Sequence, residues 1–152
     1  MQSEVAKIFG NKIRVRVCGL IIENEKVLLL NHRGMNESGI FWALPGGGVE
    51  QFESIENALI REIKEEINVE VKSIAYLKTT EFVRPPLHAI EIFFKVELKT
   101  ASQINLGFDP ELADNQQLIY AYKWFSFDEV QELGINHAQK FLTELKKDYF
   151  RN

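Results

Sequence analysis

Residues 47–69, GGVEQFESIENALIREIKEEINV, place a short charged helix directly after a glycine-rich turn. Glu62, Glu65 and Glu66 lie three and four residues apart in this helix, so their side chains fall within an arc of about 100°. Like charges at this spacing repel by about 0.2–0.5 kcal/mol per pair. A Mg²⁺ or Mn²⁺ ion offsets that repulsion, because hard cations bind carboxylate oxygens and hold substrate phosphates in their remaining positions. The stretch therefore predicts a metal-dependent enzyme that acts on phosphates.

Length and composition are those of an ordinary globular protein. The 152 residues, 45% hydrophobic and 26% charged, fit one domain with its own core. The formal net charge of −4 argues against a nucleic-acid polymer as the main partner, since proteins that bind one usually carry a basic surface. Cys18 lies in the apolar run VRVCGLII and is expected to be buried rather than catalytic. The first residues lack the apolar core of a signal peptide and no segment is long enough to cross a bilayer, so a cytoplasmic location is expected.

Apolar stretches separated by turn residues predict the strands, at 13–22, 26–30, 41–44, 69–80, 89–98 and 118–125. In the strand at 89–98, apolar residues from Ile90 to Leu98 alternate with charged ones, so Glu91, Lys95 and Glu97 are expected mostly on the opposite face from the apolar residues. Helices are expected after Ser54 and ending at Asn68, as a brief turn at 128–133, and as an amphipathic C-terminal helix at 137–149. Mixed strands with a central and a terminal helix predict an α+β fold or an α/β/α sandwich.

The letters of the charged stretch also match a known pattern, the Nudix box, at Gly47, Glu53, Arg61, Glu62, Ile63, Glu65, Glu66 and Val69. One position differs, because Asn68 stands where that pattern has Gly; Asn is the usual second choice for a positive φ, so the helix end is expected to persist. The chain thus resembles the Nudix hydrolase family over most of residues 13–149. The resemblance implies one domain over 1–152, folded as an α/β/α sandwich with a mixed β-sheet, a loop-helix box and a C-terminal helix.

The resemblance also implies a role for each matched position. Glu62, Glu65 and Glu66 would hold Mg²⁺ or Mn²⁺, with the Gly46 carbonyl as a backbone ligand. Glu62 would ligate the metal or accept a proton from the attacking water. Arg61 and Glu53 would bridge and brace the junction of loop and helix. The implied reaction is attack of water on a diphosphate linkage, with metal activating the water and neutralising phosphate charge.

Further residues are expected to contact the substrate: Gly47, Gly48, Glu50, Trp42, Phe82 and Pro85. The two glycines let the backbone approach a charged group, and a turn would swing Glu50 toward the metal. Trp42 or Phe82 would stack on a base, although either is also a common core residue. Pro85 lies sixteen residues after Val69, as in members that cleave ADP-ribose, although a proline in a hairpin loop needs no functional reason.

A further acid outside the box often completes the site in this family, before the tryptophan that matches Trp124. Residues 118–123, LIYAYK, contain none, which leaves four candidates open: Glu81, Glu91, Glu111 and Asp114. His88 and Glu91 are three residues apart on a strand, so their side chains are expected on opposite faces. This placement argues against a zinc site formed by the two residues. His32 and His137 are expected to be solvated.

The resemblance favours ADP-ribose or another ADP-sugar as the substrate. The alternative is a (deoxy)nucleoside triphosphate, including oxidised or pyrimidine nucleotides. A catalytically silent nucleotide sensor would usually have lost a box carboxylate, and a structural or interaction domain gives no reason for the acidic cluster. The expected partner is a small-molecule nucleotide, with no membrane, and a homodimer is left open.

Overall fold

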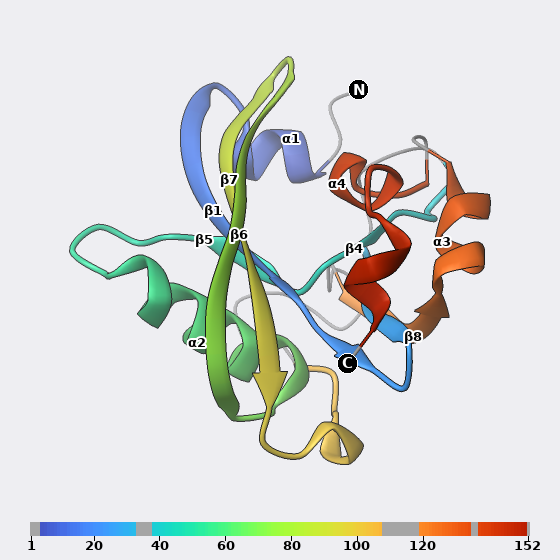
Figure 1. The fold of residues 1–152 in the computed structure, drawn as a ribbon. Helices are drawn as coiled ribbons and strands as arrows, with labels where there is room; N and C mark the ends of the chain where they lie inside the picture. Colours follow the sequence, from blue (N-terminus) through green and yellow to red (C-terminus); the bar gives the residue numbers. More distant parts are fainter. Residues whose placement is uncertain (1–3, 33–37, 108–118, 135–136, 152) are drawn as a thin grey trace.

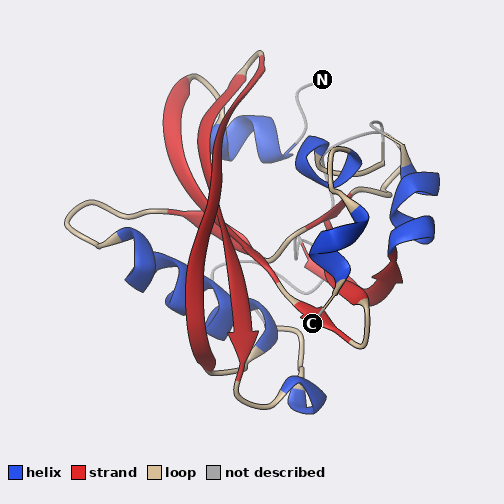
Figure 2. Ribbon diagram, viewed as in Figure 1, coloured by secondary structure: helices blue, strands red, loops and turns tan. Residues whose placement is uncertain are grey.

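The protein contains two four-stranded β-sheets (Figures 1 and 2). The computed structural model describes residues 4–32, 38–107, 119–134 and 137–151. The first sheet has the order β5-β1-β7-β6 and consists of β5 (Gly46–Gly48), β1 (Lys12–Leu20), β7 (Leu87–Leu98) and β6 (Val71–Arg84). It is mixed, because β1 runs parallel to β7 while the outer pairs are antiparallel. The second sheet is antiparallel and consists of β2 (Ile22–Glu23), β3 (Lys26–His32), β4 (Trp42–Ala43) and β8 (Ile119–Ser126). The prediction of an α+β fold with a mixed sheet is confirmed.

The helices pack on both sides of the first sheet. They are α1 (Glu4–Phe9), α2 (Ile55–Ile67), α3 (Phe127–Leu133) and α4 (Lys140–Thr143), with short 3-10 turns at Ala101–Gln103 and Lys147–Phe150. Figure 1 shows α2 on one side of this sheet, and α3 and α4 on the other side with the second sheet. Among the described residues, no helix has the length and apolarity needed to span a membrane.

Two hydrophobic clusters fill the space on the two sides of the first sheet. Neighbouring residues of a strand point to opposite faces, so Phe94 joins the cluster under α2 while Phe93 joins the other. Phe93 stacks on Phe141 of α4 with ring centroids 3.9 Å apart. Leu59 and Ile63 of α2 are fully buried in the first cluster. The helix carrying the acidic residues is therefore fixed to the sheet by its apolar stripe.

The ends of α2 lie where the sequence predicts them. Ser54 is the N-cap, and its hydroxyl accepts a hydrogen bond of 3.1 Å from the Asn57 N–H. Asn68 is the C-cap with a left-handed φ of 57°, and its N–H donates to the Lys64 carbonyl. The chain after β7 then closes the last turn, because the Gly107 N–H donates to the Glu66 carbonyl at 2.7 Å. These contacts satisfy backbone groups that a helix end leaves without partners.

The predicted single C-terminal helix at 137–149 is wrong. Helix α4 spans only Lys140–Thr143, and extended backbone at Lys146 precedes the final 3-10 turn. Phe141 and Phe150 both enter the second hydrophobic cluster, so two short elements share the apolar periodicity that one long helix would show. Helix α1 was not predicted; its Ala6 is buried.

Candidate active site

Each of the three glycines in β5 contacts a charged side chain. The Gly46 N–H donates a hydrogen bond of 2.6 Å to Oε1 of Glu66. A Cβ atom added at Gly47 would lie 2.5 and 2.6 Å from the carboxylate oxygens of Glu62, and one at Gly48 would lie 2.9 Å from Nη2 of Arg14. A larger residue at either position would displace a charged group. The glycines thus let charged side chains reach the backbone of this edge strand.

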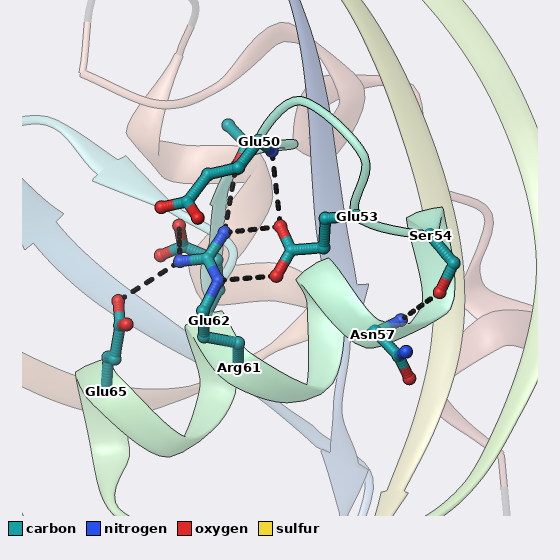
Figure 3. Close-up of polar contacts among 8 residues, drawn as sticks. Glu50, Glu53, Ser54, Asn57, Arg61, Glu62 and Glu65 are labelled. Atoms are coloured by element: carbon teal, nitrogen blue, oxygen red, sulfur yellow. Dashed lines mark hydrogen bonds and ion pairs between the residues drawn. The ribbon is translucent and has the colours of Figure 1, made fainter.

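Arg61 joins the loop after β5 to helix α2 (Figure 3). Its Nε and Nη2 donate to the two carboxylate oxygens of Glu53 at 2.7 and 2.9 Å, and Nη2 also donates to the Gly48 carbonyl at 3.0 Å. A planar guanidinium matches a carboxylate in this two-bond arrangement. The hydrogen bonds from Arg61 lower the pKa of Glu53 to about 2. The structure therefore brings together the two residues expected to brace this junction.

The remaining nitrogen of Arg61 faces the acidic residues of the helix. Nη1 donates to Oε1 of Glu62 at 2.9 Å and lies 3.3 Å from Oε2 of Glu65 (Figure 3). The Glu62 side chain is mostly buried, whereas that of Glu65 is 58% exposed. Arg61 therefore holds Glu62 firmly and Glu65 loosely.

Glu62 and Glu66 both have raised side-chain pKa values. Burial raises the pKa of Glu62, and raises that of Glu66 well above its ordinary value with a further contribution from the charge of Glu62. The Gly46 N–H and Arg16 oppose the shift at Glu66 without cancelling it. The metal-free fold thus disfavours the ionised forms of these two carboxylates, and a cation bound beside them would favour ionisation.

The donor set fits a hard divalent cation. Glu62, Glu65 and Glu66 supply carboxylate oxygens, that of Glu66 lies beside the Gly46 backbone, and Mg²⁺ and Mn²⁺ prefer oxygen ligands. In the part of the chain that the structure describes, no three acidic, His or Cys side chains already converge on one point. Arg61 instead lies between Glu62 and Glu65, and Glu65 is exposed enough to turn.

The loop at 49–53 carries two further residues of interest. Glu50 and Glu53 are tied together, since the Glu50 N–H donates to Oε1 of Glu53 at 3.2 Å. Figure 3 shows the Glu50 side chain pointing to the side of the loop on which Arg61 lies. Phe52 is 97% exposed and has a φ of 66°, a left-handed conformation that is rare for a bulky residue.

The other residues expected to contact substrate lie elsewhere. Trp42 packs edge-on against Phe125, with ring centroids 4.9 Å apart, in the second hydrophobic cluster. Phe82 is partly buried on β6, opposite Ala89 of β7. Pro85 lies in the hairpin between β6 and β7 and lines a shallow pocket there.

The structure separates this hairpin from the acidic cluster. Leu87, at the base of the hairpin, pairs with Lys12 of β1, whereas Gly47 pairs with Val17 of the same strand. Five residues of strand span about 17 Å. Pro85 is therefore not brought next to the box carboxylates.

The candidates for a further acid differ in their surroundings. Glu81 is exposed and contacts His88 at 3.2 Å, whereas Glu111 and Asp114 lie outside the described residues. Glu91 is 5% exposed, and its Oε2 accepts from Arg16 at 2.6 Å and from Gln139 at 3.2 Å. His88 and Glu91 thus have separate partners, as expected for opposite strand faces.

The exposure of four residues can be compared with expectation. Glu91 lies on the face opposite to the apolar residues of its strand, as expected, and is buried there because β7 is a central strand covered on both faces. His32 was expected to be solvated but is only partly exposed, and burial lowers its pKa to about 3. His137 is exposed and Cys18 is fully buried, as expected. Burial raises the pKa of the Cys18 thiol to about 12, which excludes a reactive thiolate at neutral pH.

Sequence reasoning missed Arg14 and Arg16. Their alternation with Ile13, Val15 and Val17 was visible, but it indicated only a polar strand face. The structure places both guanidinium groups near the acidic cluster, because β1 pairs with β5. Local pattern does not show which strand lies next to β1.

Comparisons with known proteins agree with this geometry. Residues 12–145 match the family model described as the NUDIX domain. The chain is 31% identical over 139 residues to the ADP-ribose pyrophosphatase of Methanocaldococcus jannaschii, covering 90% of this chain and 73% of that protein. It is 34% identical over 79 residues to the 8-oxo-dGTP diphosphatase of Proteus vulgaris, covering 51% and 70%. It is also 34% identical over 111 residues to an RNA pyrophosphohydrolase of Campylobacter jejuni, covering 65% and 66%.

A solved structure shares the fold. The NUDIX hydrolase from Nitrosomonas europaea superposes with a TM-score of 0.67 at 23% identity, covering 88% of this chain and 85% of that one.

Proposed function

Because this chain belongs to the NUDIX family and is a hydrolase of pyrophosphate bonds, we propose that it uses a divalent cation to cleave the diphosphate of ADP-ribose or a related ADP-sugar. The acidic face of α2 against the glycine strand β5 supports the metal, since it carries two partly or fully desolvated carboxylates, Glu62 and Glu66, with the exposed Glu65 on the same helix. The products would be AMP and a sugar phosphate.

The extent of the similarity supports the choice of substrate. The match to an ADP-ribose pyrophosphatase covers 90% of the chain, whereas the match to an 8-oxo-dGTP diphosphatase covers 51%. Substrate choice within one fold depends on residues outside the shared catalytic motif. The relative that resembles the chain over those outer segments is therefore the better guide.

The chain's own residues would divide the work as follows. Metal bound at this site neutralises phosphate charge and lowers the pKa of water. Glu62 is a partly desolvated carboxylate with a raised pKa, which suits a group that accepts a proton from water. Arg61 orients Glu62, and Glu53 fixes Arg61 by two hydrogen bonds. Gly47 and Gly48 leave room for the Glu62 carboxylate and the Arg14 guanidinium close to the backbone.

A nucleoside triphosphate is the second candidate. It is favoured by the 34% identity to the 8-oxo-dGTP diphosphatase. The two substrates differ in their products, because a triphosphate would release a nucleoside monophosphate and inorganic pyrophosphate. A silent nucleotide sensor would release neither.

The test is product release, with Mg²⁺ or Mn²⁺, from ADP-ribose, other ADP-sugars, 8-oxo-dGTP, the common nucleoside triphosphates and a 5′-triphosphorylated RNA oligonucleotide. Glu65→Gln and Glu66→Gln should lose activity. Glu56→Gln removes the same charge from an exposed position of the same helix and should keep it. AMP from ADP-ribose supports the proposal, and turnover of triphosphates alone favours the second candidate. No turnover by a folded wild type would favour the sensor.

A further inference from the structure

Arg14 is a partly buried cation that forms no ion pair with a carboxylate of the described residues, although the charges of Glu62 and Glu91 reach it. Among the described residues, it makes no hydrogen bond or ion pair, and its recorded contact is a cation–π contact, with Cζ 4.0 Å from the ring centroid of Phe9 in α1. Burial and the nearby charge of Arg16 lower the pKa of Arg14 to about 10, so it remains charged at neutral pH. A half-desolvated cation beside a like charge is unfavourable unless an anion binds it.

The position of Arg14 relates it to the acidic cluster. Its Nη2 lies beside the α-carbon of Gly48, where an added Cβ would be 2.9 Å away. The carbonyl of Gly48 accepts a hydrogen bond from Arg61, the residue that orients Glu62. Glu62 also acts electrostatically on Arg14, although the two form no ion pair. The Arg14 guanidinium therefore lies beside Gly48, on the face of β5 opposite to the one that Glu62 covers at Gly47, and close enough to Glu62 for the two charges to interact.

Arg16 adds a second cation on the same face of β1, two residues further along. Its Nη1 is held by Glu91 at 2.6 Å, and Glu91 is also held by Gln139. Its Nε is buried and has no acceptor among the described residues. Glu91 thus fixes Arg16 in place, while the Arg14 guanidinium, which makes no hydrogen bond to the described residues, remains available to an acceptor.

We propose that Arg14, supported by Arg16, binds a phosphate oxygen of the diphosphate substrate. A guanidinium presents several N–H groups in a plane and matches the geometry of phosphate. The inference rests on the proposed function in one respect, namely that the anion is a diphosphate. The metal would hold the substrate from the α2 side, and Arg14 would hold it from the β1 side. Arg14 is thereby a substrate-binding residue outside the box.

The kinetic test compares Arg14→Gln and Arg14→Lys with Lys12→Gln. Lys12 is exposed and lies two residues before Arg14 on the same strand face, so its variant removes the same charge outside the site. Loss of a charge-assisted hydrogen bond should lower kcat/KM about 10- to 100-fold in Arg14→Gln, mostly through KM. Arg14→Lys should retain part of the activity, and Lys12→Gln should stay within about twofold of wild type.

A binding test separates this inference from the proposed function. Imidodiphosphate, which is not hydrolysed, is titrated into each protein with Mg²⁺ by calorimetry. Arg14→Gln should bind it at least about tenfold more weakly than wild type does. This result supports the inference even if the wild type cleaves none of the nucleotides. Turnover by the wild type together with equal binding by Arg14→Gln overturns the inference alone.

The alternative is that Arg14 only holds α1 through Phe9. Phe9→Leu keeps an apolar side chain at that position and removes the ring that Arg14 contacts. If the role is structural, Phe9→Leu and Arg14→Gln will lower Tm equally, and neither will change the Kd for imidodiphosphate. A loss of binding in Arg14→Gln that exceeds the loss in Phe9→Leu supports the assignment.

Discussion

The guanidinium of Arg61 binds both carboxylate oxygens of Glu53, with Nε at 2.7 Å and Nη2 at 2.9 Å, across eight positions of sequence. The N-cap Ser54 and the first turns of α2 lie between the two residues. This pair therefore closes the loop after β5 onto the helix. The same guanidinium contacts Glu62 and Glu65, so the positions of these acids depend on it.

Arg61→Lys should disrupt this arrangement without unfolding the protein. Lysine presents one ammonium group and cannot make two parallel bonds to Glu53 while also reaching Gly48. We expect kcat to fall at least about tenfold and the free energy of unfolding to fall by about 1–2 kcal/mol. Lys64→Ala, at an exposed position of the same helix, serves as the control. Steady-state kinetics and urea unfolding check both effects, and wild-type kcat in Arg61→Lys would contradict the role of Arg61.

Glu53 should contribute to the loss of folding stability at acidic pH. Its pKa is lowered from 4.5 to about 2 in the folded protein, so the folded state releases this proton more readily than the unfolded state does. The stabilisation is fully present above pH 4.5 and is lost as the pH falls toward 2. Glu53→Gln should therefore lose stability at neutral pH and show a flatter profile across that window. Unfolding followed by circular dichroism from pH 7 to about pH 2 measures this; parallel profiles for the two proteins would contradict it.

Glu66 should lower the stability of the metal-free protein and contribute to the stabilisation that bound metal gives. Burial raises its pKa, so ionised Glu66 is disfavoured in the metal-free fold, and Glu66→Gln should be at least as stable as wild type in chelator at pH 8. Mg²⁺ or Mn²⁺ at 100 times its Kd should add about 2.7 kcal/mol to the wild type and much less to the variant. Thermal unfolding with and without the metal tests this. Equal metal-induced rises in Tm would exclude Glu66 as a ligand.

Phe52 should be replaceable with a gain in stability. Its ring is 97% exposed, and its φ of 66° is unfavourable for a residue with a large side chain. Asn tolerates the left-handed region, so Phe52→Asn should raise the free energy of unfolding by about 1 kcal/mol. Phe52→Ala also removes the ring but keeps most of the backbone penalty, so it should change little. Denaturant unfolding of the wild type and the two variants measures these differences. Equal stability of the Asn and Ala variants would contradict the explanation that the positive φ at position 52 costs stability.

Most of the secondary structure was predictable from local chemistry. Ser54 and Asn68 delimit α2, because their side chains and backbone preferences act within one helical turn. The C-terminal segment was not predictable, because α4 and the final turn are set by where Phe141 and Phe150 reach the second cluster. Tertiary packing there overrode the helical pattern.

The candidate site divides in the same way. The spacing of Arg61, Glu62, Glu65 and Glu66 on one helix places their side chains together in any fold that keeps the helix, so the order of residues alone predicts an acidic cluster. The partners of that cluster come from other strands. Arg14 and Arg16 lie within electrostatic reach of it, and Glu91 holds Arg16, only because β1 lies between β5 and β7. Strand order depends on the packing of the whole core, and a sequence pattern with a period of two shows the face of a residue but not its neighbour.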